Sequence, residues 1–161
     1  MKTAAEQLSF YAAYHRNRWN RLTHYFGIPS IILAILIPMM WAGVDVGWFR
    51  ITPALGFVVL VLCYYYVLDW GLATAALLLI LPLFLAAQRL GALPLNEGIP
   101  AFVCLFVGGW ILQFIGHTVF EKRRPAFTDN LIQLLLGPLF FVLELLYALG
   151  LPTNLHSQAI S

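Results

Sequence analysis

Histidines, amides and a carboxylate gather in two short stretches of this chain, far apart in sequence. The residues of the two stretches that could bind a metal or support its ligands are His15, Asn17, Asn20, His24, His117 and Glu121. Histidine is the commonest metal ligand in proteins, and its imidazole suits iron, copper, nickel or zinc. Three of the four histidines therefore predict a metal site, provided that the fold brings the two stretches together.

The second stretch has the spacing of one helix face. Gln113, His117 and Glu121 follow each other at intervals of four residues, so a helix presents them on the same side. This arrangement lets His117 bind the metal, while Glu121 either binds the metal as well or orients a ligand. Gln113 then supports the site from outside the ligand set.

The first stretch presents a geometric problem. His15 and His24 are nine residues apart, which is about 180° around a helix of 3.6 residues per turn. They can share one metal only if the helix ends or bends between them, for example near Asn20; otherwise one of them supports the other ligands. Asn17 and Asn20 can either hydrogen-bond the ligands or close the helix end, and the spacing does not choose between these roles.

Several charged and amide side chains are candidates for binding an acidic substrate. A guanidinium matches a carboxylate with two parallel hydrogen bonds, so Arg16 and Arg124 could clamp such a head group; contact with lipid head groups is the alternative. Glu144 lies inside the last apolar run and shares a helical stripe with Gln133, which should face protein rather than lipid. The candidate substrate-binding residues are Arg16, Arg124, Gln113 and Glu144.

The composition indicates whether the protein is surrounded by water or by lipid. Hydrophobic residues make up 61% of the 161 residues and charged residues only 10%, against about 45–50% and 25% in soluble domains. A soluble fold of this size cannot hide so much apolar surface, so we expect a single integral membrane domain over residues 1–161. The net charge of +2 and the lack of a basic run with interleaved aromatics argue against nucleic acid as a partner.

The apolar runs predict an all-α bundle that crosses the membrane several times. Residues 3–22 have the pattern of an interfacial helix, so that residues 1–24 carry the first half of the site and 25–161 form the membrane bundle. The expected spans are 28–42, 51–68, 72–87, 99–115 and 131–151. Gly137-Pro138 should kink the last run or break it into a re-entrant segment, so four and five spans are both open.

The basic residues predict which side of the membrane carries the site. In this layout seven of the nine share one side, and only Arg50 and Arg89 lie on the other. The basic-rich side should be cytoplasmic. The same topology brings His15, His24 and His117 to that face. With five spans His156 lies across the membrane from the site, and with four spans it could join the site.

Three motifs resemble those of a known family. They are H-x-N-x-x-N-x-x-x-H-x-x-G-x-P across His15 to Pro29, Gly116-His117-x-x-x-Glu121-x-x-x-Pro125-Ala126, and Gly137-Pro138-Leu-Phe140-x-x-x-Glu144. In this order they resemble the 2-hydroxy fatty acid dioxygenase family, the membrane proteins named for metabolism of phytosphingosine to odd-numbered fatty acids. The likeness covers most of the chain.

The resemblance implies an Fe(II)-dependent enzyme of fatty acid α-oxidation, which uses O2 to turn a 2-hydroxy fatty acid into the acid one carbon shorter. It points to His15, His24 and His117 as the iron site, with Asn17, Asn20, Glu121 and Glu144 as supporting residues. It also implies a bacterial inner membrane, or the endoplasmic reticulum of a eukaryote. The alternatives are a zinc-dependent membrane lipid hydrolase with the same residues, and a membrane binding or transport protein without catalysis. The oligomeric state is not predicted.

Overall fold

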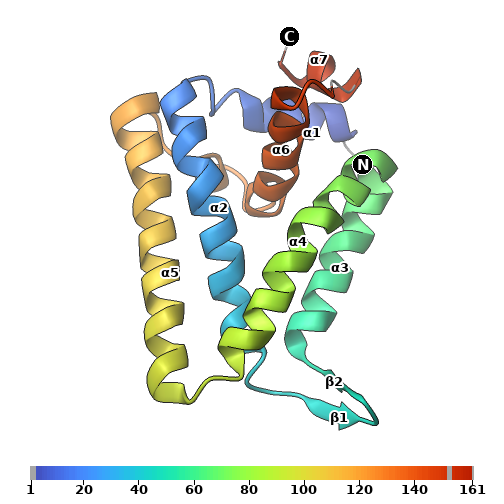
Figure 1. The fold of residues 1–161 in the computed structure, drawn as a ribbon. Coiled ribbons are helices and arrows are strands. Elements are labelled where there is room, and N and C mark those ends of the chain that lie inside the picture. Colours follow the sequence, from blue (N-terminus) through green and yellow to red (C-terminus); the bar gives the residue numbers. More distant parts are fainter. Residues whose placement is uncertain (1–2, 152–153, 161) are drawn as a thin grey trace.

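The computed structural model describes residues 3–151 and 154–160, which form an all-α bundle with one small hairpin (Figure 1). The α-helices are α1 (Ala4–Ala12), α2 (Arg18–Met39), α3 (Pro53–Leu68), α4 (Trp70–Gly91), α5 (Leu95–Ile115), α6 (Gln133–Ala148) and α7 (Asn154–Ile160). A π-helical turn, η1 (Gly116–Glu121), extends α5, and a 3₁₀ turn, η2 (Ala126–Thr128), precedes α6. The predicted all-α class is confirmed.

Among the described residues, three helices are long and apolar enough to cross a membrane: Arg18–Met40, Trp70–Gly91 and Leu95–Glu121. The shorter helices α3 and α6 are also apolar. Large apolar side chains such as Leu78 on α4 and Val107 on α5 are exposed on the outside of the bundle, where lipid rather than water would cover them. The bundle therefore has the surface of a membrane protein.

The helix expected over residues 3–22 is two helices. Thr3 caps α1 in a capping box with Glu6, and α1 ends at Ala12. Asn17 then starts α2, because its side-chain oxygen accepts the backbone N–H of Trp19. The break expected between His15 and His24 exists, but it precedes Arg18 rather than lying near Asn20.

Strands β1 (Val44–Val46) and β2 (Phe49–Ile51) pair antiparallel between α2 and α3. Gly47 turns the hairpin at φ +62°, a conformation that favours glycine. Trp48 is 95% exposed at the tip. The hairpin was not predicted from the sequence, and it lies at the end of the bundle opposite α1 and α7 (Figure 1).

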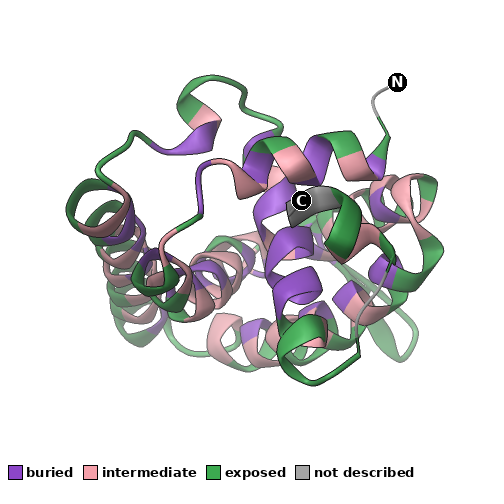
Figure 2. Cartoon of the chain, turned by 90° about the horizontal axis from the view of Figure 1, so that it is seen from above, coloured by how far each residue is buried: buried purple, intermediate pink, exposed green. Residues whose placement is uncertain are grey.

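Helix α6 is the most buried element and lies in the middle of the bundle, as the view from above shows (Figure 2). It continues through Pro138 without interruption. Its last turns lie beside the first turn of α2, where Glu144 bonds Arg21 at 2.7 Å. Its first turns lie deeper, where a Cβ added at Gly137 would be 3.7 Å from Ile28. The chain thus enters and leaves at one end of the bundle, as in a re-entrant segment (Figure 1).

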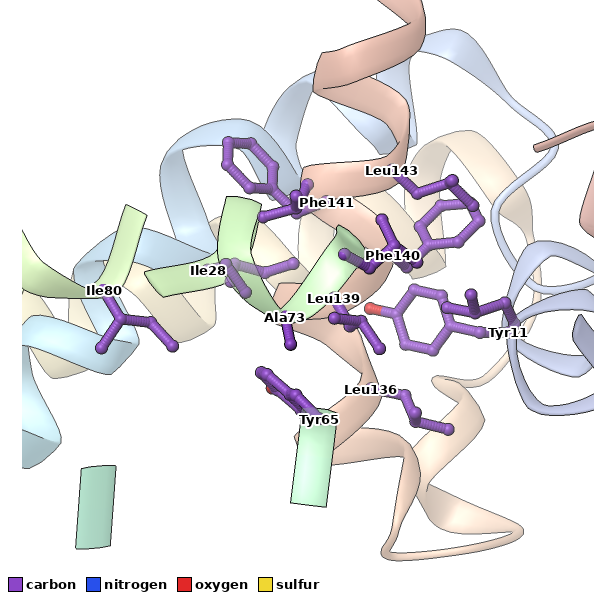
Figure 3. Packing of buried hydrophobic residues seen from close by; sticks show 14 of the residues in the cluster. Tyr11, Ile28, Tyr65, Ala73, Ile80, Leu136, Leu139, Phe140, Phe141 and Leu143 are labelled. Atoms are coloured by element: carbon purple, nitrogen blue, oxygen red, sulfur yellow. The ribbon is translucent and has the colours of Figure 1, made fainter. Parts of the chain in front are cut away.

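The main apolar core surrounds α6. Leu136, Leu139 and Leu143 are fully buried, and they pack in one cluster with Tyr11 of α1 and Tyr65 of α3 (Figure 3). The Tyr65 hydroxyl donates to the Leu135 carbonyl. Helices α2 and α5 meet closely at two glycines, since a Cβ at Gly109 would lie 3.1 Å from the Gly27 carbonyl oxygen. These contacts fix the end of the bundle that carries the histidines.

Candidate metal centre

Three histidines from separate elements converge inside this end of the bundle. His15 lies in the turn between α1 and α2, His24 on α2, and His117 in the π-helical turn η1. Their side chains are almost wholly buried, with residue exposures of 3%, 5% and 2%. One ring nitrogen from each lies within 4.8 Å of the others. The fold therefore brings together the two stretches of sequence that were predicted to meet.

The hydrogen bonds of two of these rings fix which nitrogen carries the proton. His15 Nδ1 lies 2.8 Å from the Tyr11 carbonyl oxygen, and His24 Nδ1 lies 2.8 Å from the Asn20 carbonyl oxygen. A carbonyl can only accept, so both Nδ1 atoms must donate. Each neutral ring then has an unprotonated Nε2, and these two nitrogens are 3.1 Å apart. Two lone pairs at this separation repel unless a cation lies between them.

The separation fits a shared metal ion. Two nitrogens at about 2.1 Å from one ion are about 3.0 Å apart when they subtend 90°, and about 3.4 Å apart in a tetrahedron. The observed 3.1 Å lies between these values. Metal-binding histidines also usually donate their other ring N–H to a carbonyl or carboxylate, as both do here. The residues present thus fit a metal ion.

The third histidine completes the cluster. The His117 ring lies edge-on to the other two, with centroids 4.8 Å from His15 and 5.0 Å from His24. Its Nδ1 is buried and has no hydrogen-bond partner among the described residues. A π-helical turn is rare and is frequently found at functional sites, and here it carries His117.

Burial keeps the first of these rings neutral. Removal of His15 from water lowers its pKa well below the ordinary 6.5, and the nearby His24 lowers it further, while the bond to the Tyr11 carbonyl acts in the opposite direction. His15 is therefore neutral at neutral pH, with its Nε2 unprotonated, which is the state that binds a metal.

Glu121 holds the turn that carries His15. Its Oε1 accepts the backbone N–H of Arg16 at 3.0 Å, and its Oε2 accepts the N–H of Asn17 at 2.9 Å and the Asn20 amide at 3.0 Å. Asn17 also donates to the Phe120 carbonyl. The start of α2 and the end of η1 are thus tied together by groups separated by about one hundred residues in sequence.

Asn20 has a similar linking role. Its side-chain amide also donates to the Tyr14 carbonyl, and its backbone carbonyl accepts from the His24 ring. The side chain is fully buried against Gly116, where an added Cβ would lie 2.4 Å from Asn20 Oδ1 and 2.3 Å from Thr23 Oγ1. Glycine at position 116 is therefore what allows η1 to approach α2.

An apolar cavity of about 310 Å³ opens from the histidine cluster. All three histidines line it, together with apolar side chains of α2, α3 and α6. Four further buried residues with polar atoms also line it: Tyr11, Tyr65, Gln113 and Gln133. Gln133 Oε1 has no partner among the described residues, so it can accept a hydrogen bond from a bound molecule. A mostly apolar pocket with a few polar groups is typical of a small-molecule site.

The remaining predicted residues lie around this site. Gln113 is in the cavity wall. Arg16 contacts Glu121 only through its backbone, and Arg124 pairs with Asp129 at 2.6 Å on the surface. Glu144 bonds Arg21 beside a small second void that His15 and His24 also line. Arg16, Arg124 and Glu144 do not line the 310 Å³ cavity, and their part in substrate binding stays a prediction.

His156 lies at the same end of the molecule as the site. Its Nε2 is 3.7 Å from Glu144 Oε1, and its ring stacks on Tyr147. Sequence reasoning did not single out Tyr11, whose ring stacks on His15 with centroids 4.0 Å apart. The four-residue spacing of Tyr11 and His15 on one helical stripe was the available signal.

The fold and the site together define a helical membrane-type protein with a buried three-histidine cluster that opens into an apolar cavity. A family described as "2-hydroxy-palmitic acid dioxygenase Mpo1-like" matches residues 1–149. The chain is also 37% identical over 154 residues to the "2-hydroxy-palmitic acid dioxygenase MPO1" of Saccharomyces cerevisiae, covering 94% of this chain and 84% of the yeast protein. The chain belongs to this dioxygenase family, and the resemblance read from its motifs is confirmed. No solved structure matches it.

Proposed function

We propose that this protein is an Fe(II)-dependent dioxygenase that converts a 2-hydroxy fatty acid to the fatty acid one carbon shorter. The observation that carries the proposal is the pair of unprotonated Nε2 atoms, 3.1 Å apart, of His15 and His24. Dioxygenase chemistry needs a centre that can bind O2, and three imidazoles are a suitable ligand set for iron. His15, His24 and His117 would hold the ion.

The reaction balances without an external electron donor: R-CH(OH)-COOH + O2 → R-COOH + CO2 + H2O. The bond between C1 and C2 breaks, C2 is oxidised to a carboxylic acid, and O2 is reduced. Iron would act as a Lewis acid for the 2-hydroxy carboxylate and as the group that activates O2. The substrate itself supplies the electrons, so no flavin or 2-oxoglutarate is required.

The chain's own residues bind and orient the substrate. The apolar cavity receives the acyl chain and excludes water from the reacting carbon atoms. Gln133, with its unpartnered Oε1, and Gln113 are the amides placed to hydrogen-bond the hydroxyl or carboxyl group at the head end. Glu121, Asn17 and Asn20 act through the turn that carries His15, so we assign them as positioning residues.

The site would lie at the cytoplasmic face of the membrane. α2, α3, α4 and α5 would cross it, and α6 would re-enter from the site's own side. Arg16, Arg18, Arg21 and the basic run after Glu121 flank the histidine end, whereas Arg50 lies in the hairpin at the other end (Figure 1). This distribution follows the positive-inside rule for the inner membrane of a bacterium or for the endoplasmic reticulum.

The test combines metal content with O2-dependent turnover. The protein purified without O2 should contain about one iron per chain after Fe(II) loading, and His15→Ala, His24→Ala and His117→Ala should each lose it while remaining helical. His156→Ala is the matched control, since this histidine lies outside the cluster, and it should keep the iron. O2 consumption should equal CO2 release from a 2-hydroxy acid.

Other outcomes would support the competing functions. Zinc in place of iron, with hydrolysis of a lipid that needs no O2, would favour the zinc-dependent hydrolase. No metal bound in Fe(II)-loaded protein, with His117→Ala disturbing assembly alone, would favour a non-enzymatic binding or transport protein. Full turnover of a 2-hydroxy acid without O2 would refute the dioxygenase.

A further inference from the structure

We propose that the cavity beneath α6 is an acyl-chain channel, open on one side to the bilayer, whose length sets the chain length of the substrate. The inference rests on the proposed function for the identity of the head group.

The cavity follows one face of α2 away from the histidines. Its α2 lining consists of His24, Ile28, Ile31, Ile32, Ile35 and Leu36, which recur at helical spacing. The opposite wall comes from α3, where Tyr65, Val61, Val58 and Phe57 run in the reverse direction. The twelve residues from His24 to Leu36 correspond to about 18 Å along the helix axis.

α6 has only 16 residues and does not extend through the whole bundle, and this creates the space. Gly137, where an added Cβ would lie 3.7 Å from Ile28, is about one turn inside α6, which begins at Gln133. Leu36 lies about two turns beyond Ile28 on α2, so α6 begins short of the level of Leu36. Gln133, Leu134 and Gly137 form the roof of the cavity. Leu36 is 1% exposed and packs with Ala54 and Ala87 of neighbouring helices, so it closes the far end.

One side of the channel is open. Ile35 and Phe57 are each 37% exposed and Leu134 is 46% exposed, although all three line the cavity. In a membrane these side chains meet lipid, so an amphiphile can enter sideways from the bilayer. The occupant that fits is a single-chain fatty acid, because the apolar channel ends at the histidines and basic side chains surround that end.

The length of the channel gives a quantitative expectation. An extended chain of C–C bonds of about 1.5 Å advances about 1.25 Å per carbon, so 18 Å accommodates about 14 methylenes beyond the head group. Each methylene that enters an apolar site strengthens binding about fourfold. The kcat/KM should therefore rise steeply with chain length and level off once Leu36 is reached.

The variant Val61→Phe tests the position of the chain. Val61 lies one turn closer to the histidines than Phe57, so a larger side chain there should shorten the channel by about 6 Å, or about five carbons. We expect kcat/KM for the longest acids to fall at least tenfold, while acids of eight to ten carbons change less than twofold. The matched control is Val59→Phe, since Val59 is 49% exposed and does not line the cavity. A chain-length profile that Val61→Phe leaves unchanged, in protein that keeps its helicity and metal, would overturn the channel.

A binding readout separates this inference from the proposed reaction. A 2-hydroxy acid with a terminal diazirine, photolysed in the full-length protein in nanodiscs, should label the region of Leu36 and Phe57. A diazirine near the head group should label the region of Ile28 and Tyr65. This pattern without any turnover would support the channel and refute the reaction. Labelling confined to the outer faces of α4 and α5 would overturn the channel. Equal labelling of Leu36 by a phospholipid probe and by the hydroxy acid would overturn it too.

Discussion

Replacement of Glu121 separates a positioning role from a catalytic one. The carboxylate accepts three hydrogen bonds from the start of α2, including the backbone N–H groups of Arg16 and Asn17. Hydrogen bonds to charged groups contribute about 1.5–3 kcal/mol each. Because these groups are only partly buried, we take about 1 kcal/mol each, or about 3 kcal/mol in total. If this energy orders the turn that carries His15, Glu121→Ala should weaken metal binding about 100-fold.

The graded variant is Glu121→Gln. Its one carbonyl oxygen can still accept from two of the three donors, while its amide then faces the third, so we expect a loss of about tenfold. Glu97→Gln is the matched control, because Glu97 is an exposed carboxylate at the opposite end of α5. The assay is competition for Fe(II) against a chelator, run beside turnover at saturating metal. Unchanged affinity with lost turnover would refute the positioning role and make Glu121 a catalytic residue.

Three further predictions follow from the packing and the charges. Gly116→Ala places a Cβ 2.3 Å from a hydroxyl of α2 and should lower the unfolding free energy by about 1–3 kcal/mol. Gly108→Ala is the control, because a Cβ there meets nothing within 4 Å, and it should leave the unfolding free energy unchanged. Equal melting temperatures of the two variants would contradict this prediction. The metal-free protein should lose stability as pH falls below about 6.5, because unfolded His15 takes up a proton that the folded ring, with its lowered pKa, does not. His15 alone contributes up to about 1.4 kcal/mol per pH unit, and a melting temperature constant from pH 7.5 to 5 would argue against it. Arg21→Met should cost more stability than Glu144→Gln, because it leaves the buried Glu144 carboxylate without its guanidinium, whereas the one-third exposed Arg21 can turn to water. Equal losses in thermal unfolding would contradict that order.

The sequence predicted the helical class and the apolar segments because lipid-facing helices carry their signal in composition alone. It did not predict the hairpin, whose three-residue strands are too short for a clear alternation. It left α6 open between a kinked span and a re-entrant segment. That choice depends on tertiary contacts, such as Glu144 with Arg21 and Gly137 with Tyr11, which no local pattern contains.

The three histidines could be predicted because their type and number are unusual in an apolar chain. The need for a break between His15 and His24 followed from helix geometry, but its position did not. That position depends on Asn17 as the cap of α2 and on Glu121, which binds the turn from a distant part of the chain. Gln133 as a cavity residue was not singled out, because its unpartnered oxygen is visible only in three dimensions.

The long-range link between Asn17 and Glu121 has a consequence for biosynthesis. His15 and His24 leave the ribosome early, whereas His117 follows about one hundred residues later, after helices α2 to α5 have been synthesised. At about 5–20 residues per second this interval is about 5–20 s, during which only two of the three histidines exist. Metal can be held by all three imidazoles only after α5 has reached its place beside α2. For the proposed metal centre, metal content would therefore report the docking of α5 beside α2 as well as catalytic competence.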